Sequence, residues 1–107
     1  MLNYPNFNIL RETFTTRSTK GEMWNLRHHF DLLKANFYDY TVLGNFVDNH
    51  DNGRFLNQEG SIKSYQSALA FIISQEGIPI IYYGTEQSFS GANDPYCREA
   101  LWTSMNT

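Results

Sequence analysis

Cysteine is nearly absent from the sequence, which contains only Cys97. A single cysteine excludes an internal disulfide and any cysteine-rich metal site within the chain, although it could pair with a cysteine of another segment. Unpaired cysteines usually pack as small apolar side chains. We therefore expect Cys97 to be a free, packed thiol.

Long apolar runs and an excess of charge of one sign are also absent. No uninterrupted apolar stretch approaches the roughly 18 residues of a membrane-spanning helix, and residues 1–5 lack the charged and apolar regions of a signal peptide. The net charge is −3, with lysine and arginine scattered along the sequence. Nucleic acids and membranes are therefore not expected partners, and neutral ligands are favoured.

The composition is that of an ordinary globular protein. The 107 residues are 41% hydrophobic and 18% charged, which excludes a disordered chain and a coiled coil. Repeats, low-complexity tracts and linker-like stretches are missing. Residues 1–107 are thus interpreted as one continuous piece of one domain.

Three segments are predicted to be strands. Residues 41–47 and 78–83 are continuously apolar, which is typical of strands covered on both faces. Residues 2–4 are a third candidate. Because long, helix-containing connections separate the two clear strands, we expect them to be parallel neighbours in an α/β fold.

The connections have helical periodicity. Thr19 and Glu22 have the spacing of a capping box, and a helix continues from them to about residue 37. A second helix is expected over residues 61–75, with Gly77 as its stop, and a short one over residues 7–14. The apolar faces of the two longer helices are Met23, Leu26, Phe30, Leu33 and Phe37, and Tyr65, Ala68, Leu69, Ile72 and Ile73.

Polar residues that could do chemistry follow the two clear strands. They are Asp48, Asn49, His50, Asp51 and Arg54 after the first, Tyr83, Glu86 and Gln87 after the second, and Asp94 and Arg98 further on. In parallel α/β sheets and barrels, active sites lie at the carboxyl ends of the strands. The positions of these residues favour a site there.

The residues alone leave several functions open. Asp48, His50 and Asp51 could be catalytic, could form a metal cluster, or could belong to a polar loop whose side chains cap turns. His28, His29 and Asp31 are adjacent on a predicted helix and so do not share a face, which favours a solvated surface over a ligand site.

A family resemblance narrows these alternatives. Residues 46–51, Phe-Val-Asp-Asn-His-Asp, resemble the Phe-x-x-Asn-His-Asp signature on the seventh barrel strand of the α-amylase family of glycoside hydrolases. The resemblance continues through residues 52–55, 77–87 and 91–99, and residues 2–5 resemble the sixth strand. Order and spacing look most like the fungal-type secreted α-amylases. The fold implied is a partial TIM (β/α)8 barrel, covering roughly strand–helix units six to eight.

The resemblance also implies an activity, the retaining endo-hydrolysis of α-1,4-glucosidic bonds in starch-like or glycogen-like glucans. Asp51 matches the family's catalytic aspartate that stabilises the transition state. His50 matches a residue that binds the same sugar, and Asp94 and Arg98 match positions that bind the neighbouring glucose. An α-glucan is the implied partner, and the intact protein is expected to be a secreted monomer.

The departures from the family are equally specific. The family's nucleophile and general acid lie in motifs on the fourth and fifth strands, and neither motif occurs in residues 1–107. We therefore expect the chain alone to be an inactive fragment. The usual calcium ligands also lie upstream, so calcium is expected in the intact protein only, and no metal ligand is assigned here. A related α-glucosidase or transglycosylase, or a non-catalytic truncated product, remains an alternative.

Four residues near the predicted site have an ambiguous role. Glu86 follows a strand as a general acid would, but hydrogen bonding at the barrel rim is favoured. Tyr82 and Tyr83 are interpreted as core or rim packing rather than as sugar platforms. Arg54 could hold Asp51 through a salt bridge or could only anchor the loop.

Overall fold

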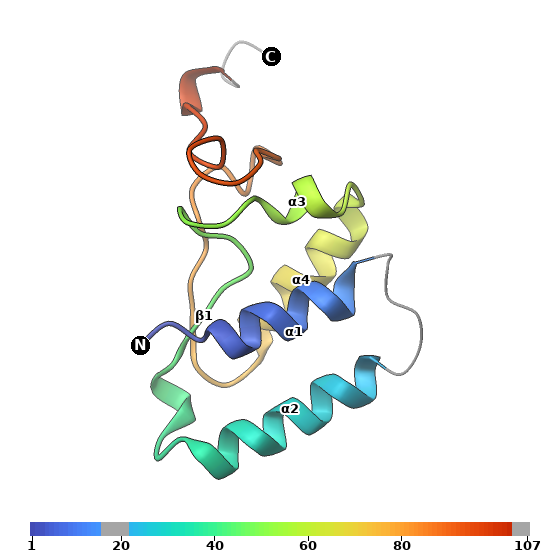
Figure 1. Ribbon diagram of the computed structural model, residues 1–107, viewed down its shortest axis with the longest axis vertical. Helices are drawn as coiled ribbons and strands as arrows, with labels where there is room; N and C mark the ends of the chain where they lie inside the picture. The colour runs from blue at the N-terminus through green and yellow to red at the C-terminus, as the bar shows by residue number, and fades with distance from the viewer. Residues whose placement is uncertain (16–21, 104–107) are drawn as a thin grey trace.

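The computed structural model describes residues 1–15 and 22–103 (Figure 1). Its elements are α1 (Tyr4–Phe14), α2 (Glu22–Asn36), the 3-10 turn η1 (Tyr40–Val42), β1 (Gly44–Asn45), α3 (Phe55–Gln58), α4 (Ile62–Ser74), β2 (Ile78–Pro79) and the 3-10 turn η2 (Leu101–Thr103). The expected capping box cannot be compared with the structure, because Thr19 lies outside the described residues.

The two strands pair in parallel, as predicted. Gly44 is opposite Ile78, and Asn45 is opposite Pro79. Leu2 forms a further parallel bridge to Gly44, with the Asn3 amide donating to the Gly44 carbonyl at 2.8 Å. The N-terminal segment, β1 and β2 therefore lie side by side in that order, and an antiparallel hairpin is excluded.

Both strands are shorter than the apolar runs that predicted them. Residues 40–42 form the 3-10 turn η1 instead, because the Asp39 side chain accepts the Thr41 amide proton at 3.0 Å and starts a turn there. β2 pairs only at residues 78–79, and a turn begins at Tyr83. The prediction that both strands are covered on both faces is right for β1 and wrong for β2, which is exposed. Within the described residues β2 pairs only with β1, so its other edge is open.

The first helix begins earlier than predicted, at Tyr4 instead of residue 7. The Asn3 side chain accepts the Asn6 amide proton and Pro5 occupies the first turn, both typical of a helix start. The strand predicted over residues 2–4 is consequently limited to the bridge at Leu2.

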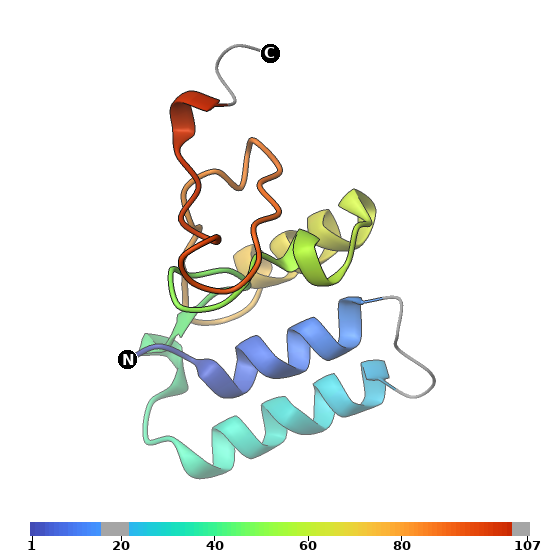
Figure 2. The ribbon, with the colours of Figure 1, turned by 45° about the horizontal axis from the view of Figure 1, so that its top comes forward.

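The three long helices pack side by side, with α1 between α2 and α4 in both views (Figure 1, Figure 2). The core cluster between them and the loop after β1 consists of Leu10, Leu26, Val47, Phe55, Leu56, Tyr65, Ala68 and Ile72. Half of the residues of the predicted apolar faces are buried and three are half-buried, whereas Met23 and Ile73, at their edges, are exposed. Among residues 1–15 and 22–103, the structure contains no helix of the length and apolar character that crossing a membrane requires.

Three buried asparagines tie the strands to the helices. The Asn45 side-chain oxygen accepts from Asn3 at 2.9 Å and from Asn6 at 3.1 Å. Its amide nitrogen donates to the Glu76 carbonyl at 3.0 Å, just before β2. Buried polar groups need such partners, since an unpaired one costs about 1–3 kcal/mol. The network therefore joins β1 to the start of α1 and to the residue shortly before β2.

Candidate active site

The loop after β1 and the segment after β2 meet at one end of the sheet. Figure 2 shows the chain beyond β2 folding back over the loop that follows β1. The Arg54 amide donates to the Gly91 carbonyl at 2.9 Å, which joins the two segments through their backbones. Residues more than 40 positions apart are thereby brought together.

All four predicted site residues lie in one cluster. The His50 Nε2 is 3.3 Å from the Asp51 Oδ1, and the Arg98 Nη2 is 3.9 Å from the same oxygen. The Arg98 Nε forms an ion pair with the Asp94 Oδ1 at 2.8 Å. The predicted convergence of Asp51 and Arg98 on one face is thus observed.

The cluster is open to solvent. The Asp51 side chain is 54% exposed, and the side chains of His50, Asp94 and Arg98 are about as accessible. Two carboxylates, an imidazole and a guanidinium on one open surface offer both acceptors and donors of hydrogen bonds. Such an arrangement is suited to the hydroxyl groups of a sugar.

Asn49 shapes the turn that presents Asp51. Its side-chain oxygen accepts the amide protons of Asp51 at 3.1 Å and of Asn52 at 2.9 Å. Its amide nitrogen donates to the Tyr4 hydroxyl oxygen at 2.9 Å. Asn49 is buried, unlike the two residues that follow it.

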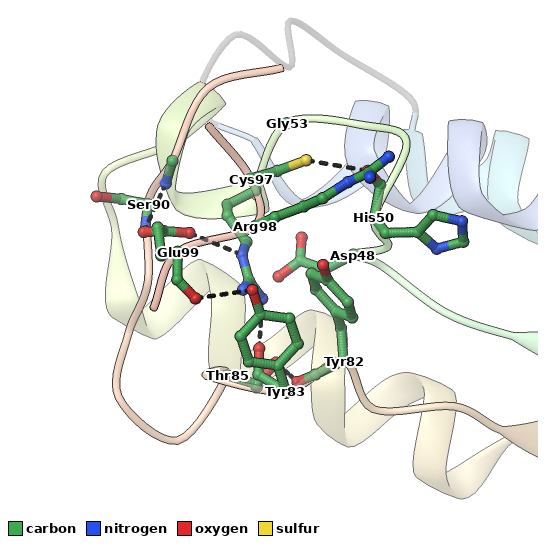
Figure 3. A network of polar contacts seen from close by, with 12 residues as sticks. Asp48, His50, Gly53, Tyr82, Tyr83, Thr85, Ser90, Cys97, Arg98 and Glu99 are labelled. Carbon is green, nitrogen blue, oxygen red and sulfur yellow. Dashed lines mark hydrogen bonds and ion pairs between the residues drawn. The ribbon is translucent and has the colours of Figure 1, made fainter. Parts of the chain in front are cut away.

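The carbonyl oxygen of His50 holds the other side of this turn. It accepts from the Cys97 Sγ at 3.2 Å and from the Arg98 Nε at 3.1 Å. Figure 3 shows both side chains reaching this backbone group while the imidazole of His50 points away from Cys97. Cys97 is a free, buried thiol, as predicted.

Gly53 completes the turn, and both of its peptide groups are bonded to side chains. Its amide donates to the Asn93 Oδ1 at 3.1 Å, and its carbonyl accepts from the Arg11 Nη1 at 2.8 Å. Arg11 comes from α1, and burial lowers the pKa of its guanidinium. The backbone from His50 to Gly53 is therefore held by side chains from several other segments.

Asp48 is a structural residue and lies apart from the open cluster. It is 3% exposed and accepts the Phe55 amide proton at 2.6 Å at the start of α3, together with the Tyr65 hydroxyl proton at 2.5 Å. Burial raises the pKa of Asp48, although both hydrogen bonds oppose the shift. The alternatives for this loop were catalysis, metal binding and the capping of turns, and the last of these holds for Asp48. Within residues 1–15 and 22–103, no group of three or more His, Cys, Asp or Glu residues could hold a metal ion.

Arg54 anchors the loop through partners other than Asp51. It is fully buried, with its Nε 3.1 Å from the Glu99 Oε1 and its Nη1 donating to the Tyr83 carbonyl at 2.6 Å. Its guanidinium carbon lies 4.1 Å from the centre of the Tyr82 ring. These contacts resolve the ambiguity left by the sequence in favour of the anchoring role.

The remaining candidates are peripheral. Tyr83 donates its hydroxyl proton to the Glu99 carbonyl at 2.7 Å, in line with rim packing, and burial raises the pKa of Tyr82 to about 12. Glu86 is exposed. His28 stacks on exposed Trp24, with ring centres 5.4 Å apart, so the predicted solvated surface holds for it.

Sequence reasoning missed the residues that hold the turn. The turn-capping alternative for this loop covers Asn49, because asparagine commonly bonds the backbone two or three residues on, but no role toward Asp51 was predicted for it. Arg11, Asn93 and Glu99 gave no signal, because their partners lie 40 or more residues away in the sequence.

Comparisons with known proteins place the chain in a family. The family model described as "Alpha amylase, catalytic domain" matches residues 2–106. Alpha-amylase 1 of Lipomyces kononenkoae is 43% identical over 102 residues, covering 95% of this chain and 16% of that protein. A cyclomaltodextrin glucanotransferase of Thermoanaerobacterium thermosulfurigenes is 44% identical over 79 residues, covering 71% of this chain and 11% of that protein.

The solved structures agree as well. An α-amylase from Malbranchea cinnamomea superposes with a TM-score of 0.89 at 39% identity, over 99% of this chain and 22% of that one. The chain thus spans between 11% and 22% of the length of these relatives. It belongs to the α-amylase catalytic-domain family and forms part of that family's TIM barrel.

Proposed function

We propose that the protein to which this chain belongs hydrolyses internal α-1,4-glucosidic bonds of starch-like or glycogen-like glucans with retention of configuration. The observation that carries this proposal is the open cluster of Asp51, His50, Asp94 and Arg98 at the carboxyl ends of parallel strands. Active sites of TIM barrels lie at that end.

Each residue of the cluster has a distinct task in this mechanism. Asp51 binds hydroxyl groups of the sugar. Its negative charge stabilises the transition state more than the ground state, because positive charge develops on the ring there. His50 donates a hydrogen bond to the same sugar. Arg98 binds the neighbouring glucose together with Asp94, whose carboxylate it already contacts at 2.8 Å.

The other parts of the machinery are assigned to the rest of the protein. A retaining glycosidase needs a nucleophile and a general acid flanking the scissile bond, and this chain contains neither family motif. Calcium is assigned to residues outside this chain as well, because the resemblance places the family's usual calcium ligands upstream. Secretion and a monomeric state are proposed from the resemblance to fungal α-amylases.

Transglycosylation is the second candidate. It is favoured by the 44% identity to a cyclomaltodextrin glucanotransferase over 79 residues. The product mixture separates the two activities, since hydrolysis of starch yields linear fragments with new reducing ends, whereas transfer yields cyclic or rearranged glucans. A non-catalytic product would yield neither.

A chimeric enzyme, called the grafted barrel below, tests the proposal. In the Malbranchea cinnamomea α-amylase, the matching segment is replaced by this chain, which supplies the cluster in a complete barrel. We expect release of reducing sugar from soluble starch. An inactive but cooperatively folded graft would contradict the proposed function.

The substitution Asp51→Asn in the grafted barrel tests the role of the charge. It preserves side-chain size, so a turn-capping residue would be affected little. A lost electrostatic contact to the transition state should lower kcat about 100- to 1,000-fold while KM and Tm stay near the parent values. Asp31→Asn, on the exposed surface of α2, is the matched control. If the Asp51→Asn variant kept more than about a third of parental kcat, Asp51 would be structural, because even a tenfold loss is only about 1.4 kcal/mol.

A further inference from the structure

The turn that carries Asp51 has no regular secondary structure to hold it. Residues 46–54 lie between β1 and α3 and contain neither helix nor strand. A carboxylate that acts on a transition state must nevertheless be fixed, because a misplacement of about 1 Å can cost about 100-fold in rate. The structure must therefore fix Asp51 through side chains.

Asn49 makes the bonds closest to Asp51. Its Oδ1 accepts from the Asp51 amide at 3.1 Å, from the Asn52 amide at 2.9 Å and from the Asn52 side chain at 2.9 Å. Because two backbone donors point at this atom, it has to be the oxygen, and the amide nitrogen has to face the other way. The group that this nitrogen faces must therefore be a hydrogen-bond acceptor.

The Tyr4 hydroxyl is that acceptor. Its oxygen lies 2.9 Å from the Asn49 Nδ2. The ring of Tyr4 is itself held by edge contacts, with centre distances of 5.2 Å to Phe46 and 5.8 Å to Phe7. The first turn of α1 thereby fixes the orientation of the Asn49 amide.

From this geometry we infer that Asn49 is a positioning residue for Asp51 and that Tyr4 sets the orientation of Asn49. The inference rests on the proposed function. Asn49 acts through the backbone of Asp51 and does not touch the substrate. These hydrogen bonds connect α1 to the turn that carries Asp51 and hold Asp51 in one orientation for substrate binding.

Three variants in the grafted barrel test this. Asn49→Ala removes the acceptor and should lower kcat roughly 10- to 100-fold, with KM close to the parent and only a modest fall in Tm from the lost hydrogen bonds. Asn49→Asp retains an acceptor for both amides and should recover most of kcat at high pH. Its added carboxylate disfavours ionisation of nearby acids, so the acidic limb of the kcat profile should move to higher pH. Tyr4→Phe should cause a smaller fall in kcat than Asn49→Ala.

The control is Asn57→Ala, whose side chain is exposed on α3 and which should leave kcat unchanged. An Asn49→Ala variant with kcat within about twofold of the parent would overturn the inference. So would parallel losses of kcat and Tm that Asn49→Asp fails to restore, because they would indicate a purely structural residue.

A crystal structure gives a readout that does not depend on turnover. The distance between the Asp51 Oδ1 and the Arg98 Nη2, 3.9 Å here, should increase in Asn49→Ala and be restored in Asn49→Asp. An unchanged distance in Asn49→Ala would overturn the inference even in an inactive graft. Failure of the proposed function is recognised separately, by an unsubstituted graft that folds but releases no sugar.

Discussion

At the scale of single residues, two aspartates three positions apart illustrate how environment separates roles. Asp48 is 3% exposed, whereas the Asp51 side chain is 54% exposed. A buried carboxylate needs donors around it, and Asp48 has the Phe55 amide and the Tyr65 hydroxyl. An exposed carboxylate retains free acceptors for a ligand. Within the signature, Asp48 therefore stabilises the loop, and Asp51 is the residue that the loop exposes to solvent.

The raised pKa of Asp48 predicts a pH dependence of stability. Its folded-state pKa lies above the unfolded value of about 3.9, so its contribution is fully present below that pH and is lost as pH rises through the folded-state pKa. Asp48→Asn removes this titration, while its amide can still accept from Phe55 and donate to the Tyr65 oxygen. We expect Tm of the variant minus Tm of the grafted parent to increase from pH 4 towards neutrality. A difference that is constant or falls over this range would contradict the assignment.

The sequence predicted which residues form the site better than it predicted what holds them. His50, Asp51, Asp94 and Arg98 followed from the family resemblance, and all four converge. The role of Arg54 could not be predicted, because its partner Glu99 lies 45 positions away and becomes its neighbour only through the fold. Transition-state stabilisation by Asp51 and sugar binding by His50, Asp94 and Arg98 remain predictions.

At the scale of secondary structure, Gly77 controls the entry into β2. Its φ is +121°, and a Cβ placed there would lie 2.3 Å from the Asn45 Nδ2 and 2.9 Å from the Leu43 carbonyl oxygen. Gly77→Ala should therefore lower the free energy of unfolding of the grafted barrel by about 1–3 kcal/mol, through strain and disruption of the asparagine network. Denaturant titration measures this. Gly60→Ala is the control, because a Cβ at Gly60 meets nothing within 4 Å; equal effects of the two substitutions would contradict the argument.

Helices were predicted more accurately than strands, for a local reason. The helix expected over residues 61–75 is observed as Ile62–Ser74, because its Ser61 cap and its apolar period lie within the segment itself. The strand expected over residues 41–47 is reduced to Gly44–Asn45. The residues just before this strand form a 3-10 turn instead, because the Asp39 side chain accepts the Thr41 amide proton. Strand length depends on pairing with distant residues, which an apolar run does not encode.

At the scale of the whole molecule, the exposed surface of β2 and the residues after it is unusual for an independent domain. Ile78, Ile80 and Ile81 are 54%, 38% and 49% exposed. The strand also has an open edge within the described residues. Apolar strands with unpaired edges are normally covered by neighbouring elements, and uncovered ones favour association. The other strands of a barrel would provide that cover.

The last prediction concerns the chain expressed alone. Without further strands to cover β2, we expect its unfolding, followed by circular dichroism during denaturant titration, to be broad and non-cooperative, because little of its strand surface is buried. We also expect no release of reducing sugar from starch, because a retaining mechanism requires a nucleophile and a general acid about 5–5.5 Å apart, and the family motifs for both are missing from the sequence. The grafted barrel, measured alongside, should unfold cooperatively and should be active. A sharp transition in the monomeric chain would contradict the folding half of this prediction, and sugar release by the chain alone would contradict the catalytic half.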